Sequence, residues 1–118
     1  MANYVKEKPE APSFSQKGLN GYKFKLDNKN LEVYYVAVTK GHDNYIISKK
    51  VTHMYYVMEG KGFFDIDGTK HEVKPGMLIE VPPNVEYAYS GKMVLLLIIS
   101  PPWFKGNDTI VRKNPSVD

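Results

Sequence analysis

The sequence predicts an all-β fold that closes into a sandwich or a barrel. Its 118 residues include nine Tyr and five Phe, with runs of Val and Ile, and these residue types favour strands. Glycine and proline recur between short β-prone segments. Up to Ser100, no stretch of a dozen residues repeats its apolar residues with the period of a helix. Roughly nine or ten short strands separated by regular turns are typical of such folds.

The first part of the chain contains three predicted strands separated by polar segments. Residues 1–20 are polar and interrupted by prolines and a glycine, which indicates a terminal arm. In residues 21–26 every second residue is apolar, as in a half-buried strand. A polar turn leads to a second strand at residues 31–38, and a polar loop leads to a short strand at residues 45–48.

The segment between residues 52 and 100 has the clearest turn signals. Asp67-Gly68 suits a two-residue hairpin, because both central residues of a type I′ turn need positive φ. Pro75-Gly76 suits the centre of a type II turn. Glycines predict further turns at residues 59–62 and 90–91. The strands between these turns are predicted at residues 54–58, 63–66, 69–73, 77–81, 85–89 and 92–100.

Length and composition predict one soluble domain. With 42% hydrophobic residues, the chain has enough apolar material for a core. We divide it into an N-terminal arm (1–20), a barrel (21–100) and a C-terminal tail (101–118) that packs on or beside the barrel. The net charge of +3 comes without a dense Lys/Arg cluster, and the longest apolar run is too short to cross a bilayer. We therefore expect no nucleic-acid or membrane partner.

Two features of the sequence bear on its compartment and assembly. The absence of cysteine excludes disulfides and thiolate catalysis, and the N-terminus lacks the apolar core of a signal peptide, so we expect a cytoplasmic protein. Trp103 and Phe104 follow the last predicted barrel strand, either as a cap on the barrel or as a contact between subunits. We expect a homodimer.

Two frames of spaced glycines lie within the predicted barrel. They run from Gly41 through His53 to Gly60 and from Gly76 through Tyr87 to Gly91. These spacings, with the hairpins between them, resemble the two motifs of the cupin superfamily over about residues 22–100. The resemblance implies a cupin-type double-stranded β-helix, that is, a jelly-roll barrel.

The resemblance also implies where a cupin would hold its metal ion. The corresponding positions are Ile47, Lys49, His53 and Tyr87. Isoleucine cannot ligate a metal, lysine brings a second cation, and only His53 is a common ligand. We therefore expect no metal cofactor, and the alternative is a divalent metal held weakly by His53 with water and carboxylates. His42, in the preceding loop, lies outside the frame.

The same positions supply the candidate functional residues. His53 and Tyr87 are predicted to face the interior, where an imidazole and a phenol can act as an acid–base pair. Some metal-free cupins isomerise or epimerise keto sugars with such residues. The alternative is that both are buried polar residues hydrogen-bonded within the core. The predicted ligand pocket further contains Ile47, Lys49, Tyr55, Glu80 and Tyr89.

Three functions follow from these residues. We expect a barrel that binds a small, carbohydrate-like molecule around His53, Tyr55 and Tyr87. The first alternative is a metal-independent sugar isomerase, epimerase or lyase that uses His53 and Tyr87 as its acid–base pair. The second alternative is a cupin enzyme that binds a metal weakly.

Overall fold

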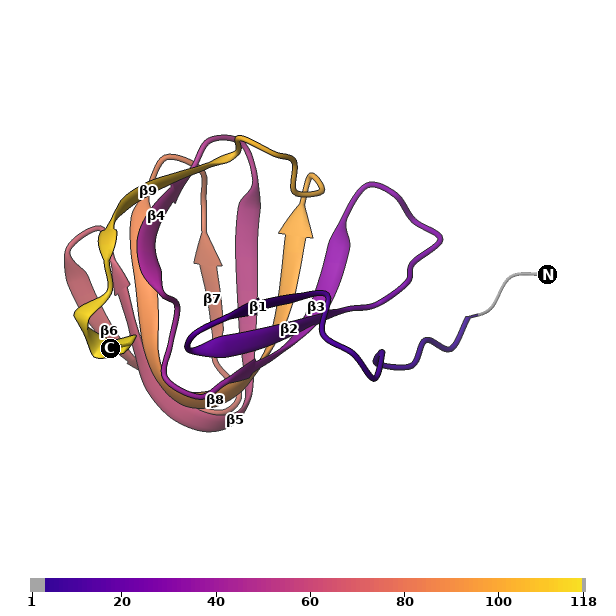
Figure 1. Cartoon of the computed structure of the whole chain (residues 1–118), viewed down its shortest axis with the longest axis horizontal. Helices are drawn as coiled ribbons and strands as arrows, with labels where there is room; N and C mark the ends of the chain where they lie inside the picture. The colour runs from indigo at the N-terminus through magenta and orange to yellow at the C-terminus, as the bar shows by residue number, and fades with distance from the viewer. Residues whose placement is uncertain (1–3, 118) are drawn as a thin grey trace.

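The computed structural model describes residues 4–117, which form nine strands and a short 3₁₀ helix (Figure 1). The predicted all-β class is confirmed. No described segment forms a helix long and apolar enough to span a membrane. The elements are β1 (Phe14–Gln16), β2 (Leu19–Lys23), β3 (Glu32–Val38), β4 (Asn44–Ser48), β5 (Thr52–Ile66), β6 (Thr69–Val73), β7 (Leu78–Val81), β8 (Glu86–Ser100), β9 (Asp108–Lys113) and η1 (Pro115–Val117).

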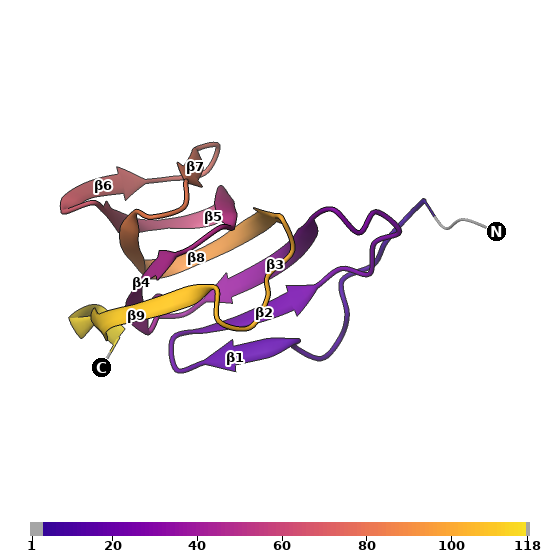
Figure 2. The same cartoon turned by 90° about the horizontal axis from the view of Figure 1, so that it is seen from above.

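Two long antiparallel strands, β5 and β8, organise the barrel. They pair from Thr52 opposite Ser100 to Ile66 opposite Tyr87. One end of β8 also pairs with β3 and the other with β4, while β5 pairs with β6 and β7. Figure 2 shows the strands curling from β6 and β7, through β5, β8 and β3, to β2 and β1. This curl encloses the interior.

The turns predicted at residues 59–62 and 90–91 are wrong, because β5 and β8 continue through them. Gly60 and Gly91 have φ of 76° and 115°, and the β5–β8 register shifts between Val57 and Glu59. A bulge and a left-handed glycine bend a strand without reversing it. The two long strands can therefore take part in both halves of the barrel.

The two sharpest turns are where the sequence predicted them. Asp67 and Gly68 both have positive φ, at 50° and 81°, as a type I′ hairpin requires. Gly76 has a φ of 95°, and the Met77 N–H donates to the Lys74 carbonyl at 3.2 Å. That geometry fits the predicted type II turn.

Both ends of the chain contribute strands that were not predicted. β1 lies within the expected arm, and β9, within the expected tail, pairs with β4. The Asp43 carboxylate accepts the N–H groups of Lys17 and Gly18 at 2.9 and 3.1 Å, which ties the β1–β2 hairpin to the barrel. The buried Asn107 side chain bonds Ser48 at 2.9 Å and the Lys50 N–H at 3.0 Å. These polar side chains hold the terminal segments against the barrel.

Candidate functional site

A cavity of about 450 Å³ opens at one end of the barrel. Two other surface hollows, one beside the loop at residues 24–31 and one around Lys61 and Lys70, are lined by neither histidine nor tyrosine. The first cavity instead has both residue types in its wall, so it is the candidate site. Its functional side chains are His42, His53, Tyr55, Tyr87, Tyr89 and Asp108.

Strand alternation brings four of the predicted residues into this wall. His53 and Tyr55 lie two apart on β5, and Tyr87 and Tyr89 lie two apart on β8. Since side chains two apart share a face of a strand, each pair faces the interior together. The His53 ring centroid is 5.8 Å from that of Tyr87.

Three other predicted pocket residues, Ile47, Lys49 and Glu80, lie outside the cavity. Lys49 and Glu80 are exposed, and on β4 it is Ile46, not Ile47, that lines the wall. The motif positions predicted on this strand were therefore shifted by one residue. Because side chains alternate between the two faces of a strand, a shift of one residue exchanges the inward and outward side chains.

His42, which the sequence left without a role, is part of the cavity wall. Its main-chain N–H donates to the Tyr89 carbonyl at 2.9 Å, which holds the loop against β8. His42 also has the same parity as the inward Ile46. This even spacing from Ile46 could have identified His42 as an inward residue, if the sequence had shown which residues of β4 face inward.

The geometry around His42 selects one form of its ring. Nδ1 lies 2.6 Å from the carbonyl oxygen of Asn44, and because a carbonyl only accepts, Nδ1 must carry the proton. Burial lowers the pKa of His42, opposed by the nearby Asp108 and Asp43 carboxylates, so the ring is neutral near pH 7. The lone pair is then on Nε2, and this nitrogen can accept a proton.

His53 is more deeply buried, with 6% of its surface exposed. Burial lowers its pKa to about 4, against the opposing effect of Asp108. Among the described residues, Nδ1 of His53 is a buried nitrogen without a hydrogen-bond partner. Such an orphaned group costs about 1–3 kcal/mol. A ligand that bonded this nitrogen would recover part of that cost.

The buried tyrosines are proton donors held in a packed cluster. The hydroxyls of Tyr55 and Tyr87 lie 2.6 Å apart, and either can donate to the other. The Tyr89 ring packs 5.3 Å from Tyr55 and 4.8 Å from Phe64. Burial raises the pKa of Tyr55, Tyr87 and Tyr89 well above the usual value, so all three phenols stay protonated.

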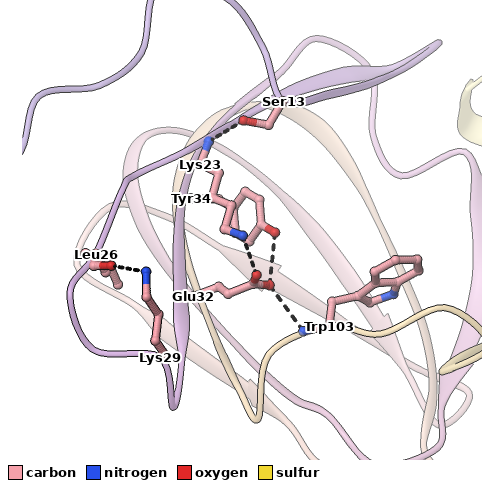
Figure 3. Close-up of polar contacts among 7 residues, drawn as sticks. All are labelled: Ser13, Lys23, Leu26, Lys29, Glu32, Tyr34 and Trp103. Carbon is pink, nitrogen blue, oxygen red and sulfur yellow. Dashed lines mark hydrogen bonds and ion pairs between the residues drawn. The ribbon is translucent and has the colours of Figure 1, made fainter.

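The rim of the cavity is organised by one carboxylate, that of Glu32 (Figure 3). It accepts the Tyr34 hydroxyl and the Trp103 main-chain N–H, both at 3.1 Å, and pairs with Lys23 Nζ at 2.6 Å. Burial would raise the pKa of Glu32, but these donors, Lys23 foremost, hold it below its usual value. The indole N–H of Trp103 donates to Asp108 at 3.1 Å. A chain of contacts thus connects β2 and β3 to the start of β9.

These residues do not fit the metal centre of a typical cupin. Within residues 4–117, no group of three or more His, Asp or Glu side chains could hold a metal ion together. Around His53 the cavity wall supplies phenols and aliphatic side chains such as Ile46 and Leu97, which are poor ligands for a divalent cation. We therefore derive the chemistry of the site from its histidines and tyrosines.

Solved structures with a similar fold include a nucleoside dehydratase, Pac13 from Streptomyces. It superimposes with a TM-score of 0.87 and 24% identity, covering 98% of this chain and 96% of that one. A variant of the same protein, with a tyrosine replaced by phenylalanine and with uridine, has a TM-score of 0.88. At this level of identity, the likeness establishes the fold.

Two other similar structures are more distant. A protein from Planctomyces limnophilus has a TM-score of 0.77 and 18% identity, covering 92% of this chain and 96% of that one. KdgF from a Halomonas species has a TM-score of 0.68 and 14% identity, covering 78% of this chain and 86% of that one. No curated protein matches the sequence. The sequence does match the cupin domain family over residues 34–99, more than half of its length, and the chain therefore belongs to the cupin family.

Proposed function

We propose that this cupin is a metal-independent lyase that removes water from a nucleoside-like sugar. The observation that carries the proposal is one cavity that combines a neutral imidazole of fixed tautomer, His42, with the hydroxyls of Tyr55 and Tyr87. Support comes from the fold shared with the Streptomyces nucleoside dehydratase, whose solved variants replace a tyrosine or a histidine. The same residue types line the present cavity.

The proposed chemistry is an elimination next to a carbonyl group. Nε2 of His42 takes a proton from the carbon beside the carbonyl, and the electrons of that C–H bond form a C=C bond. The C–O bond of the hydroxyl on the next carbon breaks. A tyrosine hydroxyl gives its proton to this leaving group, which departs as water. The imidazolium returns its proton to the phenolate, which restores both groups.

His53 and Tyr87, the acid–base pair expected from the sequence, keep separate parts in this proposal. Burial lowers the pKa of both histidines, so geometry decides between them. The bond from Nδ1 of His42 to the Asn44 carbonyl leaves its Nε2 as a fixed acceptor, and we assign proton abstraction to His42. The orphaned Nδ1 of His53 is suited to bonding a sugar hydroxyl. Tyr87, bonded to Tyr55, remains a candidate acid.

The charge of the cavity favours an uncharged substrate. Among the described residues that line it, Lys23 is the cation, and it is paired with Glu32 at 2.6 Å, while Asp108 contributes a negative charge. A phosphate group would therefore meet no free cation there and would be repelled by Asp108. A volume of about 450 Å³ is within the usual range for small-molecule sites.

The test uses uridine oxidised to an aldehyde or ketone on its sugar, incubated with chelator-treated protein. We expect mass spectrometry to show loss of one water with the wild type, and little or none with His42→Gln. His71→Gln, on exposed β6, is the matched control and should keep full activity. If the protein binds uridine but dehydrates no oxidised nucleoside, it is a binding barrel and not a lyase. If activity depends on added metal, the proposed mechanism is wrong.

A further inference from the structure

We propose that the mouth of the cavity is a stacking subsite for the planar heteroaromatic ring of the ligand, formed by Trp103 and Phe14. The inference rests on the proposed function, since it places the base of the same nucleoside-like ligand. Both side chains line the cavity, yet they remain 48% and 37% exposed. The histidines and tyrosines assigned to chemistry are less exposed.

Trp103 is anchored at both of its polar groups. Its main-chain N–H donates to Glu32, and its indole N–H donates to Asp108, each at 3.1 Å (Figure 3 shows the first). Because these contacts use the backbone and the ring edge, they orient the ring without covering its face. A ring held in this way loses little conformational entropy when a ligand stacks on it.

The Phe14 ring packs against a position where only glycine leaves enough space. It pairs across β1 and β2 with Gly21, where a Cβ atom would lie 2.2 Å from the phenylalanine ring. The ring also packs edge-to-face against Tyr34, with centroids 5.5 Å apart. Tyr34 is in turn bonded to Glu32. The same carboxylate therefore supports both aromatic walls of the mouth.

The arrangement orients the ligand. An uncharged ring gains most from stacking on a fixed aromatic surface, and such stacking tolerates different bases. The sugar would then extend inward to His42 and Tyr55, which are the groups that the proposed reaction needs. The neighbouring Phe104 is 41% exposed but does not line the cavity, so it offers a matched aromatic control in the same segment.

The experiment uses Trp103 as its own probe, because it is the single tryptophan of the chain. Titration with uridine or uracil should quench its fluorescence, whereas ribose should not. By calorimetry, Trp103→Leu should raise the Kd for uridine about 5- to 150-fold. Phe104→Leu should leave the Kd unchanged. Trp103→Phe should recover much of the affinity, since the ring is kept and only the bond to Asp108 is lost.

The outcomes separate this inference from the proposed function. If the wild type binds uridine without quenching, or if Trp103→Leu binds it as tightly as the wild type, the subsite is wrong and the lyase proposal stands. If the wild type does not bind uridine at all, the nucleoside substrate is wrong and the subsite is lost with it. Should Trp103→Leu fail to fold, the quenching of the wild type and the affinity of Phe14→Leu decide.

Discussion

Replacing His53 by glutamine should remove a large part of the protein's sensitivity to mild acid. In the folded state the pKa of His53 is about 4, because the ring is buried. In the unfolded chain it is about 6.5. Since the folded pKa is depressed, the unfolded chain binds the proton more readily. The contribution to stability is complete above about pH 6.5 and is lost as the pH falls towards 4.

The magnitude follows from these two pKa values. Between about pH 7.5 and about pH 5, the linkage of His53 alone lowers the free energy of unfolding by about 2 kcal/mol. The loss approaches about 3.4 kcal/mol below the folded pKa. Glutamine does not titrate in this range, so His53→Gln should lack this part of the loss. His42, with a pKa lowered by burial, should account for part of the dependence that remains.

Urea denaturation followed by circular dichroism at the two pH values measures the effect. The drop in the free energy of unfolding should be about 2 kcal/mol smaller for His53→Gln than for the wild type. His71→Gln, on the exposed face of β6, should behave like the wild type. An equal drop in the wild type and in His53→Gln would refute the reasoning, because His53 would then not be buried in its neutral form.

Three further predictions concern the cluster, the bends and the outer face. Tyr55→Phe should lower the free energy of unfolding by about 1–3 kcal/mol in a denaturation experiment, because the buried Tyr87 hydroxyl loses its partner at 2.6 Å. The double variant, with phenylalanine at both positions, should lose less than the sum of the two single variants. Gly60→Ala should lower the thermal unfolding temperature of the barrel more than Gly68→Ala does. A Cβ atom at residue 60 would lie 2.2 Å from a carbonyl oxygen, whereas a Cβ atom at residue 68 would meet nothing within 4 Å. We propose that the outer sheet face around Tyr56, which is 41% exposed, is the interface of the expected homodimer. Tyr56→Glu should then sediment as a monomer, and an unchanged sedimentation coefficient would count against that interface.

The barrel was predictable from the sequence because its turns have local causes. Asp67-Gly68 and Pro75-Gly76 specify their backbone angles through residue type alone. The bends at Gly60 and Gly91 were misread as turns, since a glycine marks an unusual φ but does not say whether the strand reverses or continues. That outcome depends on the partner strand, which the sequence does not reveal.

The site was less predictable than the barrel, for two physical reasons. On β4, Tyr45, Ile46 and Ile47 are all apolar, so alternation gives no phase, and the resemblance to cupins placed the inward face one residue too late. Asp108 lies on β9, whose six residues are all exposed and carry no core pattern. It reaches the cavity only because β9 pairs with β4, and such long-range pairing leaves no local signal.

The electrostatics of the cavity act differently on its histidines and on its tyrosines. Asp108 favours the charged forms of His42 and His53, and it therefore supports proton uptake by an imidazole that burial alone would make a poor base. Burial raises the pKa of Tyr55 and Tyr87 and keeps these phenols protonated as donors, and the same carboxylate adds a smaller effect in the same direction. Burial therefore keeps the imidazole neutral and the phenols protonated before the reaction, and Asp108 favours the imidazolium that proton abstraction creates. Replacing Asp108 by asparagine should slow proton abstraction in the dehydration assay, because it removes the charge that favours the imidazolium. Asparagine keeps an oxygen that can accept the Trp103 indole N–H, so the fold should be less affected.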